Sequence, residues 1–250
     1  TTVTMADIER RGISSIKELS LIAPNFYQPD YGSSITSSIY VRGFGSRIDQ
    51  PVLGLTIDDI PIMNKNSYDF DLYDIRHIEL LRGPQGTLYG RNTSGGVMNI
   101  TTLSPFDWQG FRAMAEYYSR NSYRASAAYY AQPTAKFGVS LAATFNHDGG
   151  YFRNTYTDEM CDDGNRASVR LRLKWFGNRG WNFDNIITAG YVDEGGYAYH
   201  PYNPTTEHYS PIAYNDPSGY ERLTLSEGFV ARYIGQKVRI QSTTSYQYLD

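Results

Sequence analysis

Two stretches in the second half of the sequence alternate between apolar side chains and small, polar or basic ones. Residues 136–146 read KFGVSLAATFN, and residues 166–175 read RASVRLRLKW. Successive side chains of a β-strand point to opposite faces, so each stretch has one apolar face. Arg170, Arg172 and Lys174 share the opposite face of the second stretch. The pattern predicts two long strands whose two faces differ sharply in polarity.

Runs of this kind recur between residues 106 and 250. No run of about 18 apolar residues exists, which excludes a membrane-spanning helix, but a membrane-spanning strand needs only about 9–11 alternating residues. Seven strands are predicted, at 111–119, 122–131, 136–146, 166–175, 181–192, 222–233 and 237–248.

The connections between these predicted strands alternate in length. The short ones are residues 133–135, 177–180 and 235–236, and the long ones are 149–165 and 194–221. Short turns at one end and long loops at the other are typical of an outer-membrane β-barrel. Trp175 and Trp181 flank a short turn, where an aromatic girdle is expected at the membrane interface.

Two features limit this barrel interpretation. Glu227 falls in phase with the apolar Leu225 and Phe229, so we expect either a β-bulge or a position above the bilayer. Closed bacterial barrels have an even number of strands from 8 upward, and plugged ones have about 22. Seven predicted strands are therefore an incomplete barrel.

Residues 1–105 differ from the rest of the chain in aromatic content and in predicted secondary structure. They hold six of the 23 tyrosines, whereas residues 106–250 hold the other 17 and all three tryptophans. Short helices are predicted at 7–11 and 15–22, the second with Ser15 and Glu18 as a capping box. Strands are predicted at 39–42, 52–58, 77–81 and 97–102. The sequence predicts a small α+β domain with about four strands over residues 1–105, followed by barrel strands over residues 106–250.

A Gly-rich segment closes the predicted α+β domain. Residues 75–105 read IRHIELLRGPQGTLYGRNTSGGVMNITTLSP, and their glycines permit backbone angles that other residues resist. The segment closely resembles the end of the plug domain of TonB-dependent outer-membrane receptors. Three further segments resemble this family in the same order: IKELSLIAPNF, IYVRGFGS and VLGLTIDDIPI. The resemblance covers about residues 3–104 and departs at Asp59, where glycine is commoner.

This resemblance implies a plugged β-barrel that actively transports a ligand across the outer membrane of a Gram-negative bacterium. The segment RGPQ fits the ferric-siderophore branch better than the glycan-importing branch. The implied partners are a ferric siderophore or similar small ligand, outer-membrane lipid, and TonB, which pairs with a segment upstream of Thr1. Uptake of cobalamin, haem or an oligosaccharide by the same fold is an alternative, and so is a soluble β-rich ligand-binding module.

The resemblance also implies a role for two arginines. Arg42 of VRGFG and Arg82 of LRGP match positions that, in the family, pair with barrel glutamates from later strands. Such pairs would form a latch between plug and barrel, with partners beyond Asp250. The alternative is that both arginines only donate hydrogen bonds to loop carbonyls.

Ligand contacts are expected on the outer plug loops and on a long barrel loop. Charged and aromatic side chains there can bind an anionic or aromatic chelate by charge or stacking. The candidates are Phe44, Arg47, Lys65, Tyr68 and Phe70 in the plug and Tyr197, Tyr199, His200 and Tyr202 in the barrel loop. For each one, the alternative is an ordinary solvated loop residue.

Other functions have little support in the sequence. Ser14–Lys17 fits S-x-x-K, but the partner motifs S-D-N and K-T-G are absent. The four histidines show no H-E-x-x-H spacing, and no segment fits the phosphate-binding P-loop. A net charge of −3 does not favour nucleic acid. We therefore expect no enzyme activity, cofactor, metal site or nucleic-acid partner.

Overall fold

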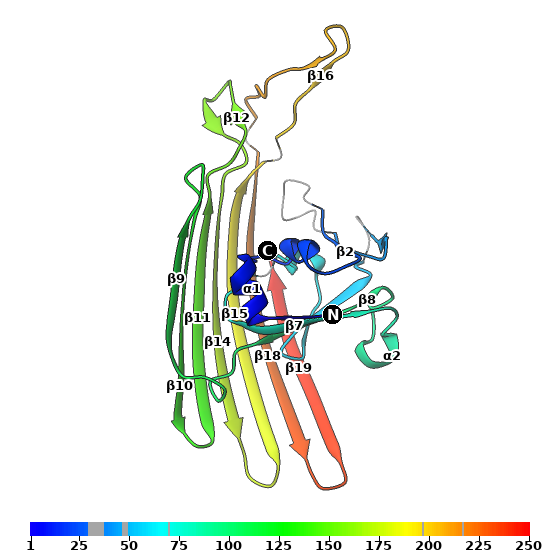
Figure 1. Ribbon diagram of the computed structural model, residues 1–250, viewed down its shortest axis with the longest axis vertical. Helices are drawn as coiled ribbons and strands as arrows, with labels where there is room; N and C mark the ends of the chain where they lie inside the picture. Colours follow the sequence, from blue (N-terminus) through cyan, green and yellow to red (C-terminus); the bar gives the residue numbers. More distant parts are fainter. Residues whose placement is uncertain (30–37, 47–49, 70, 197, 217) are drawn as a thin grey trace.

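The computed structural model describes residues 1–29, 38–46, 50–69, 71–196, 198–216 and 218–250. It has two parts (Figure 1). Seven long strands form a curved antiparallel sheet, called the wall below. A smaller N-terminal unit of short helices and strands lies against the concave side of this wall, with its strands crossing those of the wall (Figure 1).

The wall confirms all seven predicted barrel strands. Each strand pairs with the next long strand along the chain, so the wall is a continuous meander. Its strands are β9 (Gly110–Tyr117), β10 (Tyr123–Thr134), β11 (Phe137–Asp148), β14 (Gly164–Phe176), β15 (Trp181–Gly195), β18 (Gly219–Ile234) and β19 (Arg239–Leu249).

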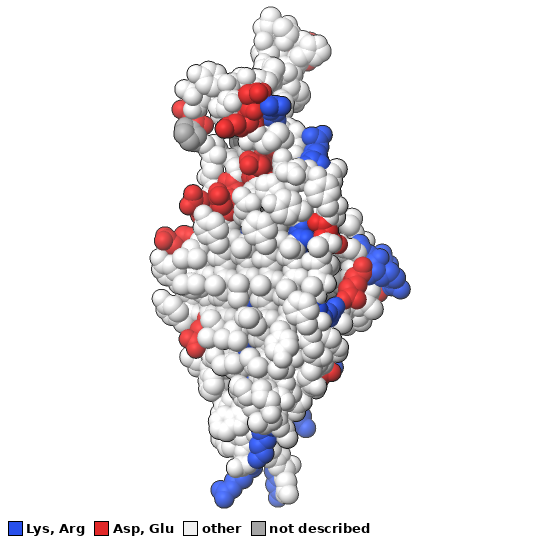
Figure 2. All heavy atoms as spheres, turned by 90° about the vertical axis from the view of Figure 1, so that its left-hand side faces the viewer, with Lys and Arg blue, Asp and Glu red and all other residues white. Residues whose placement is uncertain are grey.

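The predicted alternation sets the two faces of the wall. Leu141 pairs with Leu171 on the convex face, and Ser140 pairs with Arg172 on the concave face. Leu141 is 48% exposed, whereas Arg172 is buried beneath the N-terminal unit. Figure 2 shows a convex surface with few charged side chains across its middle, acidic ones towards one end and basic ones at the other. A band of this kind suits strands that face lipid.

The two ends of the wall differ as predicted. Short turns connect strands at one end, and the long loops gather at the other, where they carry two small hairpins (Figure 1). These hairpins pair β12 (Arg153–Asn154) with β13 (Glu159–Met160) and β16 (Tyr202–Asn203) with β17 (His208–Tyr209). Trp175 and Trp181 flank a short turn, and both pack against Phe183. The two tryptophans therefore cluster with Phe183 at this end, and their place in a membrane-interface girdle stays a prediction.

The bulge considered for Glu227 is absent. Glu227 stays in register opposite Ile187 and Tyr246, with no shift in the pairing of β18. Its carboxylate instead accepts a hydrogen bond from Asn185 Nδ2 at 3.1 Å. A neighbouring polar side chain on β15, rather than a change of register, accommodates the charge.

The N-terminal unit is built on a five-stranded sheet. Its order is β1-β7-β8-β5-β6, with β5 and β8 parallel and the other pairs antiparallel. The strands are β1 (Thr2–Thr4), β5 (Leu53–Ile57), β6 (Ile60–Ile62), β7 (Ile75–Arg82) and β8 (Gly96–Thr102). Three of the four predicted strands lie in this sheet. The predicted division after residue 105 falls between β8 and β9 and stays a prediction.

The fourth predicted strand, 39–42, was assigned to the wrong sheet. Only β3 (Tyr40–Val41) forms there, in a small sheet with β2 (Phe26–Tyr27) and β4 (Phe44–Gly45). Arg42 follows at φ 55°, a left-handed angle that ends the strand. The strand ends after two residues, and it pairs with β2 and β4 instead of joining the main sheet.

Helices in this unit are short. They are α1 (Met5–Arg11), η1 (Lys17–Leu21), η3 (Lys65–Ser67) and α2 (Gly86–Tyr89). The predicted Ser15–Glu18 capping box is only half formed. Glu18 accepts from Ser15 N at 3.2 Å, but the Glu18 N–H donates to the backbone oxygen of Ser15 and not to its hydroxyl. Within the described residues, no helix has the length and apolar character needed to cross a membrane.

Candidate ligand cavity and interface with the wall

Acidic side chains of the N-terminal unit meet arginines of the wall. Arg172 is the most connected: its Nη1 donates to Asp58 at 3.2 Å and to Thr102 Oγ1 at 2.8 Å. Its Nε and Nη2 donate to Asp184 on β15 at 2.9 and 2.6 Å. All four side chains are buried, so the cation joins both parts of the molecule where water cannot screen it.

In three further ion pairs, the arginine again comes from the wall and the aspartate from the N-terminal unit. Arg170 pairs with the buried Asp74, and Arg222 pairs with Asp69 at 2.5 Å. Arg232 meets Asp59 at 2.5 Å, but this pair is more open, with side chains 24% and 53% exposed. Alternation along β14 and β18 places all these arginines on the concave face of the wall.

An apolar contact accompanies the ion pairs. Ile60, at the tip of the β5–β6 hairpin, packs with Ile186 and Val230 of the wall. Gly228 makes room for it, since a Cβ there would lie 2.2 Å from Ile60 Cδ1. Beside it, Gln247 accepts from Met63 N at 2.9 Å and donates to Pro61 O at 2.6 Å. The edge of β6 is thus bonded to a wall side chain.

A polar cavity of about 630 Å³, called the outer cavity below, lies between the N-terminal unit and the wall near the long-loop end. This volume is within the roughly 300–1,000 Å³ range of small-molecule sites. Tyrosines, both charge types and a histidine line it, among them Lys17, Glu18, Gln28, Tyr118, Tyr123, Arg124, His147, Tyr151 and Arg166.

Gln28 is an unusual member of this lining. Its side chain is only 4% exposed, yet neither Nε2 nor Oε1 has a hydrogen-bond partner among the described residues. Buried amides are normally bonded, so this one has both a donor and an acceptor available for water or a ligand.

The predicted ligand residues of the N-terminal unit lie in different environments. Phe44, in β4, is 56% exposed, and Lys65 begins η3. Tyr68 is not the exposed loop residue that was expected: it is 2% exposed, and its hydroxyl donates to Leu53 O at 3.1 Å, while its role as a ligand contact stays a prediction. Burial also raises the pKa of Tyr68 to about 12. Tyr68 borders the outer cavity, but it is a core residue rather than an exposed loop residue. Arg47 and Phe70 lie outside the described residues.

The barrel-loop candidates lie at the far end of the long loop. Tyr199 and Tyr202 are 68% and 54% exposed, and Tyr202 packs with Tyr209 across the β16–β17 hairpin. His200 Nδ1 lies 3.0 Å from Ser210 O, and its ring meets Phe152 at 5.8 Å. The last contact ties the two long loops together. Tyr197 lies outside the described residues, and none of the other three lines the outer cavity.

The two predicted latch arginines have local contacts here. Arg82 donates to Pro24 O at 3.0 Å and to Thr1 Oγ1 at 2.9 Å. Arg42 is exposed, and its backbone N–H donates to Asn25 O. These bonds agree with the alternative interpretation for Arg82. The latch itself stays a prediction about strands beyond this chain.

Sequence reasoning missed most residues of the outer cavity. Tyr118, Tyr123 and Tyr151 stand where predicted strands run into loops, which was a usable signal. Gln28 could not be found in this way, because an isolated glutamine after a short predicted helix belongs to no recognisable sequence pattern. Within the described residues, no cluster of three or more His, Cys, Asp or Glu could hold a metal ion.

Comparison with known proteins decides the family. Residues 1–97 match the family model described as the TonB-dependent receptor plug domain. The chain belongs to the TonB-dependent receptors. Over 180 residues it is 33% identical to the pesticin receptors of Yersinia enterocolitica and Yersinia pestis, which is 69% of this chain and 26% of theirs. The chain therefore spans about a quarter of the length of these relatives. The N-terminal unit is a plug, and the wall is part of a larger barrel.

Solved structures of this family share the fold. The ferric yersiniabactin uptake receptor of Yersinia pestis superposes with a TM-score of 0.87 at 22% identity, covering 100% of this chain and 40% of that one. The ferric-catecholate import receptor of E. coli gives a TM-score of 0.77 at 16% identity, covering 100% and 38%. These structures establish the architecture of a plug inside an incomplete section of barrel.

Replacing Tyr68 by phenylalanine tests whether its hydroxyl supports the plug core or contacts the ligand. We expect Tyr68→Phe to lower plug stability by about 1 kcal/mol, the typical net value of one hydrogen bond. Ligand affinity is expected to stay at the wild-type value, because only the buried hydroxyl is removed. Hydrogen exchange of the plug and ligand titration measure the two effects. A loss of ligand affinity without a loss of exchange protection would instead support Tyr68 as a ligand contact.

Proposed function

We propose that this chain is part of a receptor that takes up a ferric siderophore across the outer membrane of a Gram-negative bacterium, driven by TonB. The outer cavity is the observation that carries the proposal. It lies near the long-loop end between plug and wall, and it combines tyrosines with Lys17, Arg124 and Arg166. Aromatic rings can stack on a chelate, and the cations can bind its oxygen donors.

The relatives support this ligand class. A receptor of Yersinia pestis with this fold takes up ferric yersiniabactin, and receptors of Pseudomonas aeruginosa with this fold bind ferripyoverdine. Family membership and the apolar convex face of the wall favour a membrane receptor over a soluble binding module. Cobalamin, haem and an oligosaccharide stay alternative ligands of the same fold.

The plug sheet offers a place for TonB to act. In the proposal, TonB pairs with a segment upstream of residue 1 by strand addition. The strand nearest that segment is β1, which is three residues long and pairs only with β7 at the sheet edge. Tension on the N-terminus would first separate this short pair, whereas the buried ion pairs with the wall lie further along the chain.

Iron uptake in cells tests the function. We expect deletion of the gene for the full receptor to abolish uptake of radiolabelled iron with one ferric siderophore of a panel, and complementation to restore it. Loss of TonB should have the same effect. Normal uptake of every chelate, together with impaired uptake of cobalamin, haem or an oligosaccharide, would replace the siderophore by that ligand.

The latch prediction can be tested with neighbouring arginines. We expect Arg82→Ala to speed release of the plug and to change transport, because later barrel strands would lose a cationic partner. Arg76→Ala is the control, since Arg76 lies in the same strand and forms a half-exposed pair with Asp107 at 2.6 Å. Equal plug release in both variants would leave Arg82 as a loop-bonding residue.

A further inference from the structure

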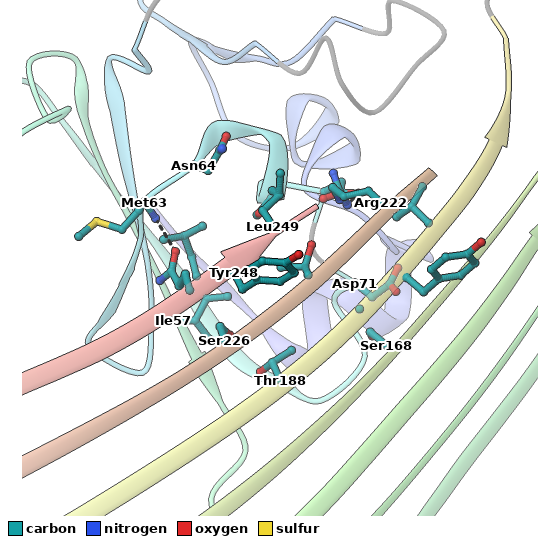
Figure 3. A pocket seen from close by; sticks show the side chains of 18 of the residues that line it. Ile57, Met63, Asn64, Asp71, Ser168, Thr188, Arg222, Ser226, Tyr248 and Leu249 are labelled. Carbon is teal, nitrogen blue, oxygen red and sulfur yellow. Dashed lines mark hydrogen bonds and ion pairs between the residues drawn. The ribbon is translucent and has the colours of Figure 1, made fainter. Parts of the chain in front are cut away.

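Two more cavities lie between plug and wall. The helix cavity, about 280 Å³, lies between α1 and strands β9, β10 and β11. The strand cavity, about 230 Å³, lies between the β5–β6 hairpin and strands β14, β15, β18 and β19. Figure 3 shows the strand cavity, with Asp71 and Ser168 on one side and Asn64 and Leu249 on another.

All three cavities contain buried polar atoms that lack a partner among the described residues. These atoms are the amide of Gln28 in the outer cavity, Ser126 Oγ and Tyr73 Oη in the helix cavity, and Arg222 Nε and Thr224 Oγ1 in the strand cavity. Such atoms are normally satisfied by water, and each cavity exceeds the roughly 30 Å³ that one water occupies. The three cavities are therefore hydrated.

Asp71 is the one described residue that lines all three cavities. Its carboxylate accepts hydrogen bonds from Thr144 Oγ1 at 2.9 Å and Asn146 Nδ2 at 3.0 Å. Thr144 lines the helix cavity, and Asn146 lines the outer cavity. Thr144 Oγ1 also lies 2.9 Å from the hydroxyl of Ser168, which lines the strand cavity. These polar side chains meet where the three cavities join.

Two arginines flank the same junction. Arg124 lines the outer and helix cavities, and Arg166 lines the outer and strand cavities. Both lie close enough to Asp71 to act on its charge. Polar and charged side chains therefore separate the hydrated spaces at this point, and the two hydrogen bonds that Asp71 accepts tie the plug to β11.

We infer that Asp71 closes a hydrated route along the wall, and that loss of its two hydrogen bonds joins the outer cavity to the two deeper ones. The inference rests on the proposed transport function, because a ligand leaving the outer cavity needs a polar path past the plug. The path runs beside strands β11 and β14 rather than through the plug sheet. A change at Asp71 should therefore alter permeability without any need for ligand.

Solute entry into liposomes tests this closure. The full receptor is purified and reconstituted, and swelling in arabinose is measured without ligand or TonB. We expect Asp71→Ala to raise the swelling rate several-fold over wild type. Asp71→Asn keeps the size of the side chain and a carbonyl acceptor, so its rate is expected to equal that of wild type. Swelling at the wild-type rate in Asp71→Ala would overturn the inference.

Asp74→Ala separates an opened route from a loosened plug. Asp74 also binds the wall, through Arg170, but it lines none of the three cavities. We expect no added swelling, and a rate equal to that of Asp71→Ala would refute the closure. If the Asp71→Ala receptor does not accumulate in cells, Asp71→Ser replaces it in the swelling assay. Because arabinose entry depends on neither ligand nor TonB, this result stands apart from the iron-uptake test.

Discussion

Replacing Arg172 by alanine is expected to weaken the attachment of the plug to the wall by about 3 kcal/mol. The reason is the burial of its partners. Asp58 and Asp184 have side chains only 2% and 0% exposed, so both would keep their charge away from water after the cation is removed. Removing one member of a buried pair usually costs about 3–5 kcal/mol for this reason.

Remaining contacts place the expected loss at the lower end of that range. Asp184 retains Lys174 at 3.7 Å and Arg232 at 3.9 Å. Asp58 retains two donors from Thr102, the backbone N–H at 3.0 Å and Oγ1 at 2.6 Å. These contacts partly stabilise the two buried carboxylates, but they do not replace a guanidinium that bonds three side chains at once.

Hydrogen exchange of the full receptor in detergent measures the loss. Peptides covering β5 and β8 report opening of the plug, and peptides from the wall serve as an internal reference. We expect Arg172→Ala to accelerate exchange more in the plug peptides than in the wall peptides, because Asp184 of the wall keeps Lys174 and Arg232 nearby. Equal acceleration in both sets would mean that Arg172 supports the wall and does not hold the plug.

Arg232→Ala is the matched control. It removes the same kind of pair from the same face of the wall, but Arg232 and Asp59 are 24% and 53% exposed. Arg232 also lies 3.9 Å from Asp184, but in this variant Asp184 keeps Arg172 at 2.6 Å. Solvent screening reduces the value of such a pair to about 0–1 kcal/mol. A double variant, Arg172→Ala with Asp58→Asn, should cost less than the sum of the two single changes, because it removes one of the stranded charges.

The wall was predictable because its signal is local. Alternation assigns each side chain of 166–175 to a face, and lipid on one side with a polar plug on the other keeps that pattern strict. Pairing register then follows from the short turns, as with Trp175 opposite Phe183. The short strands β1 and β6 were missed, since three residues carry no measurable period.

The interface was harder to predict because its partners are far apart in sequence. Arg172 and Asp58 are separated by 114 positions, and no sequence pattern near either residue identifies the other as its partner. The family resemblance suggested plug arginines with barrel glutamates, whereas this section of wall uses barrel arginines with plug aspartates. Sequence alone placed the arginines on one face but could not show which charges cover that face.

Replacing Gly96 by alanine is expected to destabilise the plug by about 2–5 kcal/mol, from backbone strain and steric overlap together. Gly96 begins β8, which lies between β7 and β5 in the sheet. Its φ is +151°, and an added Cβ would lie 2.3 Å from Leu81 O. Because that contact is with backbone, a rotamer change cannot relieve it, and the β7–β8 pairing itself must shift.

Gly86 provides the matched control from the same Gly-rich segment. It lies in α2, has no positive φ, and an added Cβ would meet only Thr93 Oγ1, at 3.9 Å. Alanine there should be neutral or stabilise the plug by up to about 1 kcal/mol, since it restricts the unfolded chain. Plug exchange is again the measurement, and equal behaviour of the two variants would contradict the argument. The two glycines look alike in the sequence, but only Gly96 holds two strands at a distance that excludes a side chain.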